Sequence, residues 1–427
     1  MLGQGTVAVV PHVQAANANS LAGPITLGPI TLGSASMRVL AACSLGGAGH
    51  LNPLLPLLGA ARRGGHETVV VGPPALASLV ELAGYRFLSG GEPPEEVVAP
   101  IRERLPVAPP AEASALGNRE LFGRLATAAM LPAMKRICAE WLPDLVLREP
   151  CEYASAVVAG QAGIATAQVA ISTAEAEAGS IAVATPALEA HRTGLADELW
   201  SSPYLTRFPV SLDPSPFPST IRFREVVAPS GRSLPDWWNG CRAPLVYMSF
   251  GTVLGYMSVA GSVFRTMLTA VKDLDARVLL TVGRRFDASR LGTIPGNVHV
   301  EDWVDQADVM QEADLVVCHG GSGTALGALA AGVPMVIVPV FADQFENSRR
   351  IAEQGAGLVV GAAPATDGVN RNVIGPGDAP RITRGIETVL GTPSYRQQAA
   401  LISAEMGAAP EAGDVLGALL AGTLTGG

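Results

Sequence analysis

Short apolar runs alternate with helix-like stretches along most of this chain, and that alternation limits the fold more than any other feature. Residues 37–43 are an apolar run, residues 44–50 a glycine-rich loop, and residues 51–65 a helical stretch that starts near Asn52-Pro53 and ends in Gly64-Gly65. A second apolar run, residues 67–72, follows directly. This order predicts a βαβ unit, which implies a parallel sheet with right-handed crossovers.

A second set of such units begins at residues 244–252, and its further apolar runs are residues 277–283, 298–301, 314–318, 334–340 and 357–361. The stretch between the two sets, residues 200–243, is rich in proline, tryptophan and serine and is typical of an interdomain connection. With 427 residues, of which 48% are hydrophobic, the chain is long enough for two domains. We therefore predict an α/β fold of two Rossmann-like, doubly wound domains facing across a cleft.

The expected boundaries follow from these patterns. Residues 1–36 contain no Lys or Arg and are expected to be a flexible, disordered extension. The N-terminal domain is expected over residues 37–225, the linker over 226–243 and the C-terminal domain over 244–427. We expect the last helix to pack back on the N-terminal domain.

Composition excludes several classes of function. The net charge is -9 and no run of Lys or Arg occurs, so a nucleic-acid-binding surface is not expected. No membrane span is expected either. Five scattered cysteines without a CxxC pair favour a reducing, cytoplasmic compartment. Histidines in metal-binding spacing are absent, and the Asp273–Asp275 pair is interpreted as a solvated turn, so we expect no metal and no cofactor.

The glycine-rich stretch at residues 314–332 predicts an anion site. A strand ends at Cys318, a glycine loop follows, and a helix of small residues begins. Such a helix start exposes unpaired amides and carries partial positive charge, which binds phosphate without basic side chains. Thr324 could add a hydroxyl and His319 a further donor. The same glycines also suit a tight strand-to-helix turn that only needs close packing.

Three other polar features stand next to predicted strands. Asp343 and Gln344 follow the run at residues 334–340 and suit the binding of vicinal sugar hydroxyls, although Asp343 could also cap the next helix. Trp303 could stack on a nucleobase or belong to a core. His50 precedes a helix start, whose positive end favours a neutral imidazole that could act as a general base, or it is a structural loop residue. Glu149 ends a strand of the same sheet and could orient His50, or it forms an ion pair with a nearby arginine.

Three segments together resemble the family 1 glycosyltransferases of GT-B fold that decorate natural products such as polyketides in actinomycete antibiotic pathways. These segments are residues 37–67, residues 143–159 and, most specifically, residues 298–357. The resemblance implies that His50 is the catalytic base and Glu149 the acid that orients it, where the family more often has Asp. It places Asp305 where the family often has Pro. The donor contacts that it implies are Thr252, Trp303, Val304, Gln306, His319, Gly321, Ser322, Gly323, Thr324, Asp343 and Gln344.

The resemblance also implies a reaction. A (deoxy)sugar would move, with inversion and without a metal, from a dTDP- or UDP-sugar to a hydroxyl of an apolar aglycone such as a polyketide. Residues 88–140 would hold that aglycone, and attachment through carbon is left open, as are a homodimer and an activator protein. The nucleotide sugar is a co-substrate rather than a cofactor. Two alternatives remain: a GT-B sugar-nucleotide epimerase, which needs no acceptor, and a catalytically silent protein that binds nucleotide sugars.

Overall fold

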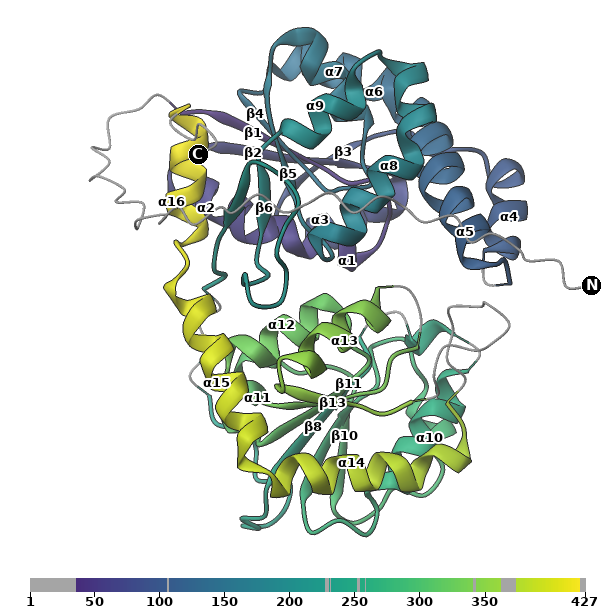
Figure 1. Ribbon diagram of the computed structural model, residues 1–427, viewed down its shortest axis with the longest axis vertical. Coiled ribbons are helices and arrows are strands. Elements are labelled where there is room, and N and C mark those ends of the chain that lie inside the picture. Colours follow the sequence, from purple (N-terminus) through teal and green to yellow (C-terminus); the bar gives the residue numbers. More distant parts are fainter. Residues whose placement is uncertain are drawn as a thin grey trace, which may run out of the picture. The chain divides into compact units, whose positions relative to one another are not determined.

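A computed structural model describes residues 36–105, 107–226, 230, 232–251, 254–257, 259–340, 343–361 and 374–422. Nearly all of the expected extension lies outside these ranges, and so does Thr252, one of the expected donor contacts. The described chain contains two parallel sheets, each with helices around it (Figure 1). This agrees with the predicted pair of α/β domains.

The first sheet has seven strands in the order β3-β2-β1-β4-β5-β6-β7, all paired in parallel. The strands are β1 (Arg38–Ala42), β2 (Glu67–Gly72), β3 (Arg86–Ser89), β4 (Leu145–Arg148), β5 (Ala165–Val169), β6 (Tyr204–Thr206) and β7 (Thr220–Arg222). Strands β1 and β4 read as continuous apolar runs because helices cover both faces of a parallel sheet. These two strands therefore carry the core, and their charged side chains stand at the strand ends.

The helical segments of this half connect the strands. They are α1 (Ala48–Leu51), η1 (Asn52–Leu54), α2 (Leu55–Arg63), η2 (Pro74–Leu76), α3 (Ala77–Leu82), α4 (Glu95–Arg104), α5 (Pro110–Ser114), the π-helical η3 (Ala115–Ala126), α6 (Thr127–Trp141), α7 (Ala154–Ala162), α8 (Ala174–His191) and α9 (Leu195–Ser201). Segment η3 packs closely on α8, since a Cβ on Gly123 would lie 3.2 Å from the Cβ of Ala187.

The second sheet has six parallel strands in the order β10-β9-β8-β11-β12-β13. The strands are β8 (Leu245–Ser249), β9 (Arg277–Thr281), β10 (Val298–Glu301), β11 (Leu315–Cys318), β12 (Met335–Ile337) and β13 (Gly357–Val359). The helices are η4 (Leu254–Tyr256), α10 (Ala260–Val271), η5 (Ala288–Leu291), α11 (Gln306–Glu312), α12 (Ser322–Ala330), α13 (Gln344–Glu353), η6 (Pro376–Asp378), α14 (Ala379–Gly391), α15 (Pro393–Ala408) and α16 (Ala412–Leu420).

The last helix, α16, packs on the first sheet's side of the chain. Ala412, Val415 and Leu416 share a buried apolar cluster with Leu57 and Leu58 of α2. Figure 1 shows the yellow end of the chain beside the purple α2. The chain therefore crosses between the two α/β units twice, once between β7 and β8 and once between α15 and α16.

The stretch that the sequence suggested as a connection, residues 200–243, contains more structure than expected. Strands β6 and β7 lie inside it and extend the first sheet. Each has three residues among prolines, which is too short to show a periodic pattern. Further on, Trp237 stacks on His299 with ring centroids 4.3 Å apart, and the Trp238 indole donates to the Asn297 carbonyl. The later part of the connection is thus fixed beside β10.

Two further expectations concern the environment of the chain. Within the described residues, no helix combines the length and apolar character needed to cross a membrane. All five cysteines are free thiols.

Candidate active site

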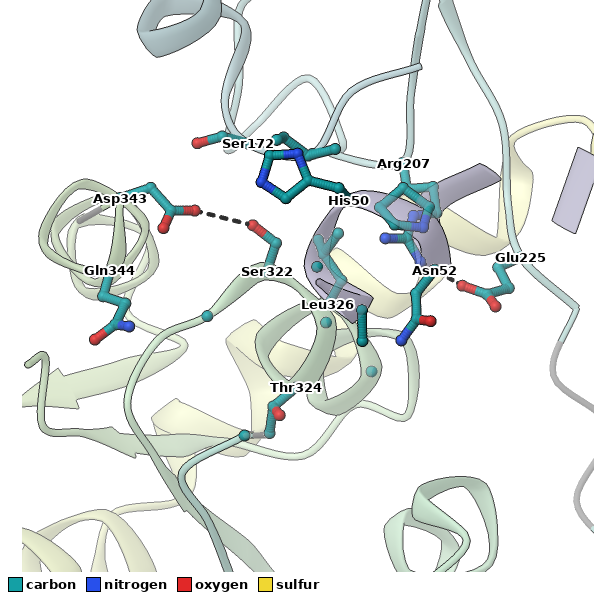
Figure 2. Close-up of a pocket in the computed structure, with 18 of the residues that line it drawn as sticks. His50, Asn52, Ser172, Arg207, Glu225, Ser322, Thr324, Leu326, Asp343 and Gln344 are labelled. Atoms are coloured by element: carbon teal, nitrogen blue, oxygen red, sulfur yellow. Dashed lines mark hydrogen bonds and ion pairs between the residues drawn. The ribbon is translucent and has the colours of Figure 1, made fainter. Parts of the chain in front are cut away.

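A cleft of about 2490 Å³ lies between residues that follow the carboxyl ends of both sheets. His50 and Ser172 line it from the first α/β unit, and His319, Ser322 and Asp343 from the second. Figure 2 shows His50 and Ser172 gathered close to Ser322 and Asp343. Ligands of doubly wound α/β folds bind at such strand ends. The topology therefore brings together residues that are almost 300 positions apart.

Glu149 follows β4 directly and is fully buried behind His50. Its Oε1 accepts hydrogen bonds from the Ser44 amide (2.8 Å) and the Ser44 hydroxyl (2.5 Å), and its Oε2 accepts one from the Cys151 amide (2.7 Å). Burial by itself raises the pKa of Glu149, but the charge of His50 and the Ser44 hydrogen bonds outweigh it and leave the pKa lowered. The carboxylate is therefore held ionised and in one orientation.

His50 lies on α1, and its Nδ1 is 3.2 Å from Oε2 of Glu149. This is an ion-pair distance, although the pair does not meet the geometry of a hydrogen bond. The side chain is 18% exposed. Glu149 thus approaches His50 through Nδ1. Glutamate, although longer than the expected aspartate, does reach the imidazole.

The direction of the His50 pKa shift differs from the one that its position at a helix start suggested. Burial lowers the pKa most strongly, but the charge of Glu149 and the contact with its carboxylate together leave the pKa raised. Helix α1 has only four residues, so its dipole is weak compared with a buried carboxylate at 3.2 Å. The imidazole is therefore neutral only above a pKa higher than that of an ordinary histidine.

The glycine loop contains a tight, closely packed turn and, one turn further on, a glycine that faces the cleft. Gly320 has a φ of +83°, and a Cβ on Gly321 would lie 2.5 Å from Nε2 of His319. These two glycines are needed for the tight turn and for packing. A Cβ on Gly323, by contrast, would meet nothing within 4 Å, and Gly323 lines the cleft at the first turn of α12. Packing within the protein therefore does not account for this glycine, and an anion bound at this helix start stays a prediction.

Substitutions at Gly323 and at Gly321 should have opposite effects on thermal stability. Gly323→Leu replaces glycine with a good helix former in open space, so we expect thermal stability to stay the same or rise. It fills the space expected for a diphosphate, so nucleotide affinity should fall at least about tenfold. Gly321→Ala should lower stability, because the methyl group would collide with His319. Thermal unfolding and nucleotide titration measure both effects, and a Gly323→Leu variant with full nucleotide affinity would contradict the assignment.

His319 lies half-buried at the end of β11, and its Nδ1 has no hydrogen-bond partner. Burial lowers the pKa of His319 to about 4, and a backbone contact with Ser249 offsets only part of that. The ring is therefore neutral near pH 7. It can donate a single N–H to an anion but brings no positive charge.

The loop from Trp303 to Gln306 faces the same cleft. Trp303 is 56% exposed with the Arg284 guanidinium 4.9 Å from its ring centroid, so it is not a core residue. Val304 lines the cleft and packs on the core beneath it. Asp305 caps α11 by accepting from the Ala307 amide, which gives this position a local structural function.

Gln306 forms hydrogen bonds with two elements of the second α/β unit, β8 and α12. Its Nε2 donates to the hydroxyls of Tyr247 and Thr324, each at 3.3 Å. The Thr324 hydroxyl, which thus accepts from Gln306, keeps its own proton for another acceptor. Thr324 lies on the first turn of α12, so its hydroxyl can add to the amides there.

Asp343 precedes α13, and its side chain makes no helix-capping hydrogen bond. Its Oδ2 instead accepts from Asn347 Nδ2 (3.2 Å) and from the Ser322 hydroxyl (3.4 Å), a contact drawn in Figure 2. Burial raises the pKa of Asp343 despite these donors. Gln344 is buried, and its Oε1 accepts from the Val340 amide, so part of its amide group stabilises the loop before α13.

Comparison with known proteins agrees with this geometry. Residues 59–243 match the N-terminal domain, and residues 265–421 the C-terminal domain, of the family described as erythromycin biosynthesis protein CIII-like. The L-demethylnoviosyl transferase of Streptomyces niveus is 30% identical over 75% of this chain and 84% of its own length. The elloramycin glycosyltransferase ElmGT of Streptomyces olivaceus is 33% identical over 77% of this chain and 87% of its own. The chain belongs to this family of actinomycete natural-product glycosyltransferases.

The fold comparison also finds a glycosyltransferase. The crystal structure of the glycosyltransferase SnogD from Streptomyces nogalater superposes with a TM-score of 0.69 at 25% identity, covering 91% of this chain and all of that one. This glycosyltransferase therefore has the GT-B fold that its sequence predicted.

All predicted donor-side residues of this glycosyltransferase that lie in the described ranges line the cleft, and Glu149 lies behind His50. Their individual functions remain predictions. Reasoning from sequence missed Ser44, which anchors Glu149, and Ser172, which faces the cleft from the other wall. It also missed Asn347, although its spacing of four residues from Asp343 on a helix was a usable signal. Among the described residues, no group of three or more His, Cys, Asp or Glu side chains could hold a metal ion.

Proposed function

We propose that this glycosyltransferase moves a sugar from a dTDP- or UDP-linked donor to an apolar natural-product acceptor, with inversion at the anomeric carbon. One observation carries the proposal: an imidazole backed by a buried carboxylate, His50 with Glu149, faces the amide-rich start of α12 across a single cleft. A base on one wall and an anion site on the other are the two parts that such a transfer needs.

The reaction divides between the two walls. The Nε2 of His50 takes the proton of the acceptor hydroxyl, and Glu149 stabilises the imidazolium that forms. The acceptor oxygen bonds to the anomeric carbon from the face opposite the diphosphate, and the bond from that carbon to the diphosphate breaks. The amides at the start of α12, with the Thr324 hydroxyl, stabilise the charge that gathers on the leaving group. For attachment through carbon, His50 would ionise a phenol and a ring carbon would attack instead. That carbon would then lose its proton, which restores the aromatic ring and the phenol.

The acceptor side of the cleft supports an apolar aglycone. Segments α5 and η3 and the described residues between α4 and α5 contribute mainly small or apolar side chains there, while α4 itself contributes Arg102. The ring centroids of Phe122 and His50 lie 6.4 Å apart. The apolar side chains are those of Leu105, Ala108, Pro110, Ala113 and Phe122. The reaction is proposed to need no metal, and the five free thiols support the expected reducing, cytoplasmic setting.

Incubation with a panel of dTDP- and UDP-sugars and of aromatic and macrolide acceptors tests the proposal. Mass spectrometry should detect a glycosylated acceptor, NMR should show the inverted anomer, and added EDTA should not change the rate. Donor turnover without an acceptor would support an epimerase instead, and nucleotide binding without any turnover would support a silent binding protein.

Asp343 is expected to recognise the sugar rather than the nucleotide. Asp343→Ala should weaken the binding of the nucleotide sugar about 10–100-fold, as expected for the loss of hydrogen bonds to a charged group. Free nucleotide should bind nearly as before. Trp303→Ala is the matched comparison, because a lost nucleobase contact should weaken both ligands equally. Calorimetric titration of each variant with both ligands gives the answer, and equal losses in the Asp343→Ala variant would exclude a contact with the sugar.

A further inference from the structure

Arg350 is a buried arginine on α13, the helix that begins directly after Asp343. Its Nη1 donates to the Leu212 carbonyl (2.9 Å) and lies 3.3 Å from Oδ1 of Asp213, while its Nη2 binds Oε2 of Glu175 at 2.5 Å. Leu212 and Asp213 belong to the loop between β6 and β7, and Glu175 to the first turn of α8. The guanidinium thus ties the donor-side helix to two segments of the first α/β unit.

The segment reached through these contacts consists of the connection from β5 to α8 and the first two residues of α8, and residues 170–175 are here called the acceptor-side loop. The Ala174 amide donates to Oδ2 of the same Asp213 that contacts Arg350. The amides of Ile171 and Ser172 both donate to Oε1 of Glu177 at 2.8 Å. Two buried carboxylates therefore hold this loop, and one of them, Asp213, is shared with Arg350.

The two ends of this network flank the reacting centre. Ser172 of the acceptor-side loop lies beside His50 in Figure 2, opposite Asp343. Asp343 precedes the helix that carries Arg350, so any shift of α13 relative to the loop changes the distance between sugar and acceptor. Misplacement of reacting groups by about 1 Å can lower a rate about 10²-fold.

We propose that Arg350 is a positioning residue that couples the sugar-binding end of α13 to the acceptor-side loop. The planar guanidinium donates to several acceptors at fixed angles, so it fixes direction as well as distance. When the coupling is lost, the walls separate more often and water reaches the anomeric carbon. Water then forms the new C–O bond, the bond to the diphosphate breaks, and free sugar and nucleoside diphosphate are released. This inference rests on the proposed sugar transfer.

Arg349 provides a matched control on the same helix. It forms ion pairs with Glu346 and Glu353, both on α13, and its side chain is 51% exposed. Arg350 also contacts Glu346 through its Nε, so the two arginines share this partner. Arg349→Met nevertheless removes the same kind of side chain from the neighbouring position and leaves the contacts of Arg350 with Leu212, Asp213 and Glu175 in place.

The experiment compares Arg350→Met with Arg349→Met and the unchanged protein. For Arg350→Met we expect at least a tenfold lower kcat for transfer, on the order of the loss from misplaced reactants, and a larger share of donor lost to hydrolysis. Amide hydrogen exchange in residues 170–175 should become faster while exchange in β1 stays the same. Arg349→Met should change none of these. Unchanged hydrolysis share and unchanged exchange in Arg350→Met would overturn the proposal.

Glu175→Gln is a second, milder variant for the case in which Arg350→Met does not fold. The Glu175 side chain is 74% exposed, so its change should be tolerated while one contact with Arg350 weakens. It should shift the hydrolysis share and the loop exchange in the same direction, and a wild-type result for both would contradict the coupling. If the unchanged protein transfers no sugar to any acceptor, the proposed function is wrong, and hydrogen exchange alone then decides whether Arg350 holds the loop.

Discussion

Replacing His50 with alanine is expected to lower the rate of sugar transfer by about 10²–10⁴-fold, the usual contribution of a positioned general base. Glu149 contacts the imidazole of His50, and His50 lines the cleft. Without this imidazole, the acceptor hydroxyl would have to lose its proton to water. Donor binding should persist, since the predicted donor contacts all belong to the second α/β unit. Steady-state kinetics with titration of the nucleotide sugar measures both quantities.

His66→Ala is the control for this variant. His66 belongs to the same α/β unit but lies at the opposite end of β1, where its Nδ1 accepts from the Met37 amide. We expect a small loss of stability from that hydrogen bond and unchanged turnover. Normal turnover by the His50→Ala variant would remove the base assignment, and loss of donor binding would show that the substitution had disturbed more than the base.

The positions of His50 and Glu149 could be predicted because both depend on topology rather than on detail. In a parallel sheet, residues that follow adjacent strands meet at the carboxyl edge, and β1 pairs with β4. The loop after β1 and the first residue after β4 must therefore come close together. The same rule placed the glycine loop after β11 and Asp343 after β12 at one edge of the second sheet.

Other features depend on contacts that no local pattern records. Ser172 faces Asp343 only because two separate sheets lie across one cleft, and nothing around Ser172 in the sequence indicates this. Strands β6 and β7 are too short for an alternating pattern and gain their stability from strand pairing, β6 with β5 and β7 with β6. In the sequence, Arg350 looks like a surface residue of an amphipathic helix, as its neighbour Arg349 is. Only the fold shows that Arg350 is buried while Arg349 is exposed.

The pKa of His50 shows where reasoning from a single element fails. A helix start disfavours a positive charge nearby, and that effect alone predicted a neutral ring. The buried Glu149 carboxylate comes from a strand about 100 residues later and acts over 3.2 Å. Its effect overrides that of a four-residue helix, so the sign of the shift is set by the tertiary contact.

That contact predicts the effect of Glu149→Gln. If His50 is the general base, transfer needs the neutral imidazole. Activity should then fall as the pH drops through the His50 pKa, which lies above the ordinary value in the unchanged protein. Without the negative charge, burial dominates and the His50 pKa should fall, which moves the acid limb of the pH–rate profile to lower pH. The maximal rate should nevertheless drop by about 10²–10⁴-fold, because an amide N–H facing Nδ1 leaves the ring proton on Nε2, where the base must be free.

Glu149→Asp separates charge from reach in the same measurement. Aspartate keeps the charge but is one methylene shorter, so the hydrogen bonds from Ser44 and Cys151 would compete with the contact to His50. We expect the acid limb of Glu149→Asp to lie closer to that of the unchanged protein than the acid limb of Glu149→Gln does. The maximal rate of Glu149→Asp should lie between those of the unchanged protein and Glu149→Gln. An identical acid limb in the unchanged protein and in Glu149→Gln would mean that the limb does not report His50. The base on the first wall would then have to be sought elsewhere in the cleft.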